Sequence, residues 1–140
     1  MKWVKFIAII SMAVLFIGFL YFRMEQKFTP PTQDEIQVGY KVDDESAKIN
    51  DLTYTIKRKQ PFHVGVIYAN MVEKDDETAA KLQILKTENK LVVFEDTWQD
   101  TNGTSGKINE IDPKSWESGQ YWIKLYRGDK LIRTKEIKVN

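Results

Sequence analysis

Hydrophobic and polar residues are arranged in two different ways along the chain. Residues 6–22 form an uninterrupted apolar block that contains no charged side chain. From residue 36 onward, apolar and polar residues instead alternate with a period of two, as in residues 36–42. An apolar block of this length predicts a helix that spans a membrane, and strict alternation predicts β-strands with one buried face. The pattern therefore predicts one membrane helix followed by an all-β domain.

The alternating runs are short, and turn-forming residues separate them. After the first run they cover residues 52–56, 62–71, 80–86, 90–98, 120–127 and 130–139, with a weaker candidate at 107–111. Short strands that recur at a spacing of about 8 to 12 residues are typical of a β-sandwich or a barrel. We therefore expect residues 36–140 to form one antiparallel β-sandwich of about seven strands.

The apolar block admits two interpretations, an uncleaved anchor or a cleaved secretory signal. Lys2 and Lys5 supply the basic start that both require, and Trp3 and Tyr21 lie where interfacial aromatic residues belong. The block slightly exceeds the apolar core of about 7 to 15 residues in a signal peptide, and no small-residue cleavage pattern follows it. We therefore expect residues 1–22 to be a signal-anchor helix, with the cleaved signal as the alternative.

The charges that flank the apolar block predict its orientation. Lys2 and Lys5 precede it, whereas Arg23 and Lys27 follow it with Glu25 between them. Because positive charge is in slight surplus before the block, the N-terminus is expected in the cytoplasm.

The segment after the block is expected to be a linker. Residues 23–35 contain Pro30 and Pro31, which cannot continue a helix and favour an extended, semi-stiff chain. Residues 36–140 then form the domain outside the cytoplasm. The sequence thus predicts a single-pass protein of the cell membrane that contacts the lipid bilayer through residues 6–22.

One local motif is more specific than the alternation. Residues 117–123 read ESGQYWI, which resembles the D-x-G-x-Y-x-C stretch that opens strand F of immunoglobulin domains. The resemblance implies an immunoglobulin-like or fibronectin-III-like sandwich and no particular family. It implies that Tyr121 is the corner tyrosine whose hydroxyl holds the preceding loop, with an ordinary core aromatic as the alternative. Glu117 replaces the usual aspartate, and Ile123 stands at the position of the disulfide cysteine.

Composition excludes several kinds of chemistry. The 140 residues include 21 Lys and Arg against 20 Asp and Glu, whereas nucleic-acid-binding proteins usually carry a basic surplus. The absence of cysteine excludes a disulfide framework, a thiolate zinc site and a cysteine nucleophile. The single histidine, His63, lies inside a predicted strand, and a serine triad needs a histidine base. We therefore expect no nucleic-acid partner, no metal, no cofactor and no enzymatic activity.

Acidic residues cluster in predicted turns and raise the alternative of a calcium site. The clusters are residues 43–45, residues 75–77, and Asp96 with Asp100 and Asn102. Calcium takes six to eight oxygen ligands, but the spacing of an EF-hand loop is absent from all three clusters. Solvated turns that keep the domain in solution and discourage edge pairing are the favoured interpretation.

Three polar or aromatic residues of the run at 120–127 share one face. Trp122, Lys124 and Tyr126 alternate with apolar residues, so they face outward if the apolar side belongs to the core. Exposed Trp and Tyr with a cation between them suit a protein interface or a surface for sugar stacking. Cover by a neighbouring strand, or by the loop that carries Trp116, is the alternative.

These features together predict a binding protein. We expect a membrane-anchored, extracytoplasmic interaction module, an accessory or structural subunit of an envelope or surface assembly. Its partner is expected to be another envelope or membrane protein, contacted through Trp122, Lys124 and Tyr126. The alternative is a carbohydrate- or calcium-dependent ligand-binding domain in which Trp98, Trp116 and Trp122 stack on sugars.

Overall fold

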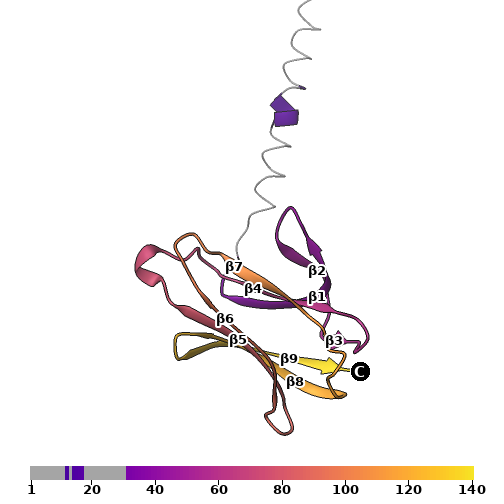
Figure 1. Ribbon diagram of the computed structural model, residues 1–140. Coiled ribbons are helices and arrows are strands. Elements are labelled where there is room, and N and C mark those ends of the chain that lie inside the picture. Colours follow the sequence, from indigo (N-terminus) through magenta and orange to yellow (C-terminus); the bar gives the residue numbers. More distant parts are fainter. Residues whose placement is uncertain (1–11, 13, 18–30) are drawn as a thin grey trace, which may run out of the picture.

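The chain after residue 30 folds into two facing β-sheets (Figure 1). The computed structural model describes residues 12, 14–17 and 31–140. This part of the chain contains one short 3-10 turn, η1 (Lys74–Asp76), and nine strands. The strands are β1 (Glu35–Asp43), β2 (Lys48–Leu52), β3 (Thr55–Ile56), β4 (Phe62–Ile67), β5 (Ala79–Lys86), β6 (Val92–Gln99), β7 (Gly106–Ile111), β8 (Gly119–Arg127) and β9 (Lys130–Val139).

The strand order is that of an immunoglobulin-like sandwich. One sheet has the order β2-β1-β4-β7 and the other β3-β9-β8-β5-β6, and the chain crosses between the sheets from β4 to β5 and from β7 to β8. In immunoglobulin domains, strands A, B and E share one sheet while C, F and G share the other. Strands β1, β4 and β7 correspond to the first set, and β5, β8 and β9 to the second. The predicted all-β, immunoglobulin-like architecture is therefore confirmed.

The strand pattern differs from the expectation in the region before β4. Nine strands form in the described chain where about seven were expected, because β2 adds a hairpin to β1 and β3 pairs with only two residues of β9. The run at residues 52–56, expected as one strand, is split between β2 and β3. The run is split because β2 pairs with β1 in one sheet and β3 pairs with β9 in the other, so the chain passes between the sheets at Thr53 and Tyr54.

The expected membrane helix lies almost entirely outside the described residues. Within residues 6–22, only residues 12 and 14–17 are described, and they are helical. No helix in the described part of the chain is long and apolar enough to cross a membrane. The anchor, its orientation and the bilayer contact through residues 6–22 therefore stay predictions.

The core lies between the two sheets and is built from alternate residues of the strands. On β8, Tyr121, Ile123 and Leu125 are almost fully buried, and Phe62 and Val64 of β4 are buried with them in the same cluster. Burying one such side chain contributes about 1.5–3 kcal/mol. Because the chain has no cysteine, this apolar cluster holds the sheets together without a disulfide.

Tyr121 ties β8 to the loop that precedes it. Its hydroxyl donates a hydrogen bond to the carbonyl of Glu117 at 2.8 Å, which is the geometry of a tyrosine corner. The ring stacks on Trp116 with centroids 5.2 Å apart, and Trp116 meets the edge of Phe62 at 5.9 Å. The Glu117 carboxylate pairs with Lys86 of β5, and this hydrogen bond raises the pKa of Lys86 and lowers that of Glu117.

Candidate functional site

The outer face of the five-stranded sheet carries the residues that the sequence singled out. Trp122, Lys124 and Tyr126 alternate with the buried residues of β8, so they point away from the core. In the register with β5 they stand opposite Leu85, Gln83 and Lys81, respectively. All three are half-buried. The alternation thus brings them onto one continuous surface; whether they bind a partner stays a prediction.

Lysines lie over the two aromatic rings, one from β8 itself and two from other segments. The Lys90 Nζ is 3.7 Å from the Trp122 ring centroid, and the Lys124 Nζ is 5.3 Å from the same centroid. The Lys81 Nζ is 4.8 Å from the ring of Tyr126. Such cation–π contacts contribute about 0.5–1 kcal/mol at exposed sites and more when water is excluded. We call Lys81, Lys90, Trp122, Lys124 and Tyr126 the lysine–aromatic face.

The tight turn between β5 and β6 places Lys90. The residue has a left-handed backbone (φ 60°), its N–H donates to the Lys86 carbonyl, and its Nζ donates to the Thr87 carbonyl at 2.9 Å. This conformation folds the side chain back over Trp122. The pattern along β8 does not indicate Lys81 or Lys90, because both reach the face only through the pairing of β5 with β8. Aligning the buried Leu82 with Leu125 would have placed Lys81 beside Tyr126.

The lysine–aromatic face keeps its charge unneutralised. Within the described residues, no carboxylate forms an ion pair with Lys81, Lys90 or Lys124. The nearby Glu95 carboxylate accepts a hydrogen bond from Gln83 instead. The face therefore offers flat aromatic surface together with ammonium groups that form no ion pair, a combination that suits a partner with apolar and acidic groups.

The three tryptophans do not form a common stacking surface. Trp116 is only 6% exposed and packs in the core beneath Tyr121, so it neither covers Trp122 nor reaches solvent. Trp98 packs against the core, and its indole Nε1 donates to Asp100 at 2.9 Å. The alternative sugar-stacking set of Trp98, Trp116 and Trp122 is therefore not brought together, because Trp116 is buried and Trp98 packs against the core.

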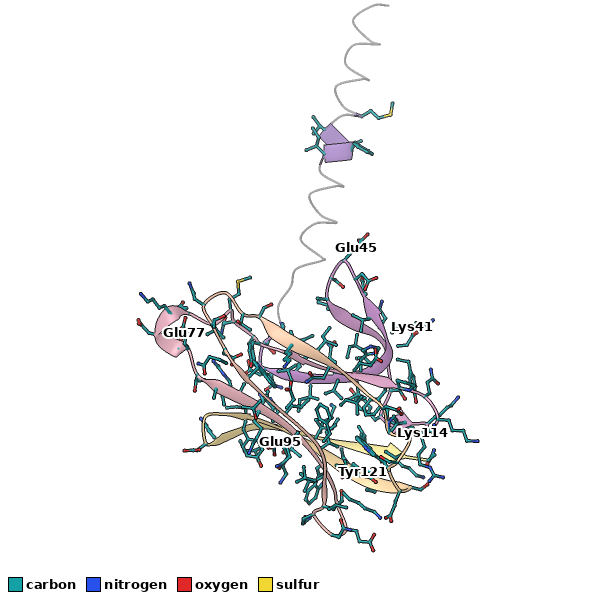
Figure 2. The ribbon with its side chains drawn as sticks, viewed as in Figure 1. Lys41, Glu45, Glu77, Glu95, Lys114 and Tyr121 are labelled. Carbon is teal, nitrogen blue, oxygen red and sulfur yellow. The ribbon has the colours of Figure 1, made fainter. Side chains whose placement is uncertain are left out.

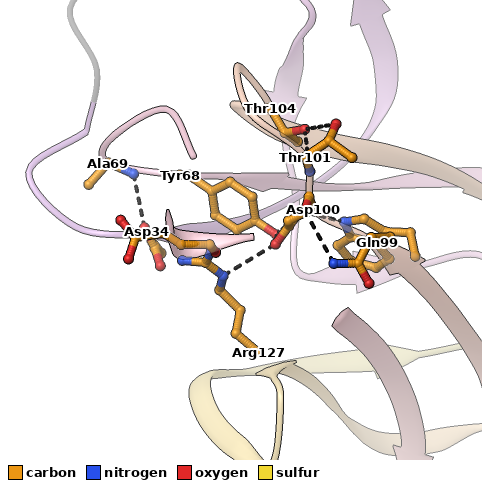
Figure 3. A network of polar contacts seen from close by, with 10 residues as sticks. Asp34, Tyr68, Ala69, Gln99, Asp100, Thr101, Thr104 and Arg127 are labelled. Carbon is orange, nitrogen blue, oxygen red and sulfur yellow. Dashed lines mark hydrogen bonds and ion pairs between the residues drawn. The ribbon is translucent and has the colours of Figure 1, made fainter. Parts of the chain in front are cut away.

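Asp100 is the centre of a buried polar cluster (Figure 3). Its carboxylate is fully buried and accepts hydrogen bonds from the Tyr68 hydroxyl at 2.8 and 3.0 Å and from the Arg127 Nε at 3.2 Å, in addition to Trp98. The Arg127 guanidinium also lies 5.0 Å from the Tyr68 ring. Burial, followed by the hydrogen bond to Asp100, raises the pKa of Tyr68 far above its ordinary value. These contacts join the ends of β4, β6 and β8.

The buried Asp100 corrects the favoured interpretation of Asp96, Asp100 and Asn102 as a solvated turn, and the contacts of these residues also speak against the alternative of a calcium site. Asp96 forms an ion pair with Lys107 of β7, and Asp100 is held by Arg127. The Asn102 N–H donates to the Glu77 carboxylate. The two aspartates thus neutralise separate cations and do not converge. In the part of the chain that the structure describes, no group of three or more acidic or histidine side chains could hold a metal ion.

His63 lies on the outer face of the other sheet. It stands opposite Glu110 in the pairing of β4 with β7, and its Nε2 is 3.4 Å from the Glu110 carboxylate. The histidine is mostly buried and Glu110 is exposed. The pair is an ordinary cross-strand contact between oppositely charged side chains when the histidine is protonated.

Comparison with protein family models and with curated protein sequences gave no match. Among solved structures, the chain is similar to an immunoglobulin-like protein from Pseudomonas aeruginosa, with 16% identity, a TM-score of 0.49, and coverage of 79% of this chain and 100% of that chain. A superoxide reductase (neelaredoxin) from Ignicoccus hospitalis has 16% identity and a TM-score of 0.49 over 77% of this chain and 80% of that chain. A β-glucosidase from Listeria innocua has 9% identity and a TM-score of 0.46 over 76% of this chain and 16% of that chain.

Proposed function

We propose that this protein is a membrane-tethered, extracytoplasmic interaction module that binds another envelope or surface protein. It acts as an accessory or structural subunit, and the lysine–aromatic face is its contact surface. The observation that carries the proposal is Trp122, which lies between two lysines on the outer side of a sheet. Tryptophan and tyrosine are enriched among the few residues that supply most of the affinity at the centres of protein interfaces.

The arrangement of the face supports protein binding for an electrostatic reason. A partner that covers Trp122 and Tyr126 excludes water from the lysine–ring contacts, which strengthens cation–π attraction. An acidic group on the partner can then pair with the ammonium groups of Lys81, Lys90 and Lys124, which have no carboxylate partner among the described residues. Such complementary charge also speeds association and disfavours wrong partners.

The N-terminal apolar block supports the tether. The side chains of residues 14–17 are apolar and 64–73% exposed, so the β domain does not cover them. A helix in the bilayer fixes the domain close to the membrane surface and raises its effective concentration toward membrane partners without any new contact.

The inventory of reactive groups supports binding over catalysis. The chain has no cysteine, and its single histidine pairs with Glu110. The buried Asp100 carboxylate already accepts three side-chain hydrogen bonds, which hold it in a structural role.

Site-specific photocrosslinking in native membranes tests the contact surface. A photoreactive amino acid at position 124 should give one discrete crosslinked product, because this position lies at the centre of the lysine–aromatic face. The same amino acid at the exposed turn residue Lys59 is the matched control. Equal crosslinking at positions 124 and 59, or none at position 124, would overturn the proposal.

Membrane fractionation tests the tether separately. The full chain should remain with membranes after an alkaline carbonate wash and should retain its N-terminal peptide in mass spectrometry. Recovery in the wash, or a mature N-terminus after residue 22, would contradict an uncleaved anchor and leave the contact surface to be judged by crosslinking alone.

A further inference from the structure

A groove with a volume of about 670 Å³ lies on the opposite side of the sandwich from the lysine–aromatic face. It runs over the outer face of the four-stranded sheet. The end of β4 and the loop after it form one side, the start of β7 another, and the turn of the β1–β2 hairpin a third, with Pro31 at the rim. Volumes of about 300–1,000 Å³ are typical of small-molecule sites.

The β1–β2 hairpin builds one wall of this groove. Strand β1 pairs with β4 through Glu35–Gly39 and with β2 through Gly39–Asp43, so β2 is the edge strand, and its Ile49 side chain reaches over Gly65 on the outer face. Gly39 and Gly65 make this approach close: a Cβ at residue 39 would lie 2.5 Å from Ile49 Cγ2, and one at residue 65 would lie 3.1 Å from Ile49 Cδ1. Figure 2 shows the hairpin, with Glu45 at its tip, standing away from the rest of the sheet.

The lining of the groove is mostly apolar. Ile67 and Ile108 lie on the outer face of the sheet, because Ile67 follows the buried Val66 on β4 and Ile108 pairs with Gly65, which is on the same face as Ile67. Ala47, Ala69 and Met71 complete the apolar surface. Met71 is 68% exposed although it is a large apolar residue. An exposed apolar side chain beside an apolar groove indicates a binding surface, because a ligand there would remove apolar area from water.

The charge in the groove is positive. No aspartate or glutamate lines it, and its two charged lining residues are Lys48 and Lys107. The Lys107 ammonium is already paired with Asp96. Lys48 forms no ion pair within the described residues. The Ser105 hydroxyl lies in the same lining and can donate a hydrogen bond to an anion, whereas the Ser46 hydroxyl already donates to the Asp43 carboxylate at 2.8 Å.

We propose that this groove binds a long-chain carboxylic acid. The acyl chain lies along Ile67, Ile108 and Met71, where each buried methylene adds to the affinity. The carboxylate pairs with the Lys48 ammonium at the hairpin turn. A cation at one end of an apolar groove that has no carboxylate in its lining is complementary to an amphiphile with one negative charge.

The position of the groove relative to the N-terminal block suits this ligand. Residues 23–30 separate Pro31 from the end of the apolar block. Eight residues span at most about 29 Å when fully extended, so an anchored chain keeps the groove within that distance of the bilayer. Long-chain acids partition into bilayers, which would be their source. The proposal goes beyond the proposed function, because the groove and the lysine–aromatic face are on different sheets.

Photoaffinity labelling of the full chain in native membranes tests the proposal. The probe is a palmitic acid analogue with a diazirine in its chain and an alkyne for detection, compared with the methyl ester of the same analogue. The acid should label peptides that contain residues 66–71 and 105–108, and the uncharged ester should label them about tenfold less because it lacks the ion pair.

Two substitutions of groove residues outside the apolar core test the proposed contacts one at a time. Met71→Glu should reduce labelling by the acid about tenfold, because it puts a carboxylate beside the acyl chain. Lys48→Glu should remove the preference for the acid over the ester. Gln120→Ala, an exposed residue on the opposite sheet, is the matched control and should change neither result.

Three outcomes would overturn the proposal. These are labelling confined to residues 1–30, labelling that neither substitution changes, and equal labelling by a diazirine phosphatidylcholine, which would identify a bilayer lipid as the occupant. None of them bears on crosslinking from position 124, so failure here is distinguishable from failure of the proposed function.

Discussion

At the scale of single residues, the Asp100 carboxylate links side chains from three strand ends. It is the one buried charged residue in the described chain, and three donors from β8 and from the ends of β4 and β6 converge on it. Asp100→Asn removes the negative charge opposite Arg127 and turns an amide N–H₂ toward a donor. We expect the free energy of unfolding to fall by about 3 kcal/mol, as for other broken buried ion pairs.

Urea unfolding of the variant measures this loss. Asp75→Asn, in the exposed η1 turn, is the matched control and should change the free energy of unfolding by less than about 0.5 kcal/mol. Equal, small effects of the two substitutions would contradict a structural role for Asp100.

Tyr68 predicts how stability changes at alkaline pH. Burial and the hydrogen bond to Asp100 raise the pKa of Tyr68 in the folded state above the value of about 10 expected when unfolded. The unfolded chain therefore loses this proton first, so the stabilisation is complete below about pH 10 and is lost as pH rises further. Tyr68→Phe should make the fall in stability above about pH 10 shallower. Chemical denaturation at several pH values measures the slope, and an unchanged slope would argue against a protonated Tyr68.

Some of these residues were predictable from the sequence and some were not. The motif at residues 117–123 located Tyr121, and alternation along one strand placed Trp122, Lys124 and Tyr126 on one face. Lys90 and Asp100 could not be found in this way. Lys90 reaches Trp122 because of a left-handed turn, and Asp100 is bound by donors up to 32 positions away in the sequence. No local sequence pattern indicates either arrangement.

At the scale of elements, the start of β7 depends on a glycine. Gly106 has φ of 148°, and a Cβ at this position would lie 2.0 Å from the Val66 carbonyl oxygen of the paired strand β4. Gly106→Ala must therefore move one strand away from the other, and overpacking of this kind costs about 1–3 kcal/mol in addition to the backbone strain.

Gly103→Ala is the matched comparison. Gly103 also has a positive φ, 89°, but no atom lies within 4 Å of the Cβ position. Its substitution should cost only the backbone strain, about 1 kcal/mol. Thermal and urea unfolding of both variants measure the difference, and equal losses would show that the close approach of β7 to β4 is unimportant.

The strands themselves were largely evident from alternation, because one face of each is buried. The order of the strands was not, since a period of two gives no information on which strand pairs with which. The hairpin of β2 was missed because Lys48–Leu52 shows little alternation, with Ile49 its only buried residue. The weak candidate at 107–111 is part of β7, in which Ile111 is the only buried residue.

At the scale of the whole molecule, the sandwich presents two different surfaces. The five-stranded sheet carries the lysine–aromatic face, and the four-stranded sheet carries the apolar groove beneath the β1–β2 hairpin. Because the surfaces lie on opposite sheets, a protein partner and a small amphiphile could occupy them together. The sequence predicts the β8 residues of the first surface from one strand, whereas the groove depends on the turn of a hairpin whose β2 strand was not predicted.

The central claim is that the lysine–aromatic face binds a protein partner. Affinity capture of the full chain from solubilised membranes, with quantitative mass spectrometry, tests it by comparing the Trp122→Ala, Tyr126→Ala double variant with Tyr54→Ala. Tyr54 is an exposed tyrosine with Lys135 over its ring, but it lies at the opposite edge of the sheet. The double variant should lose its specific partners by about 30-fold or more, as expected for two hot-spot residues, while Tyr54→Ala keeps them. Retention of the same partners at the same level by a folded double variant would contradict the claim.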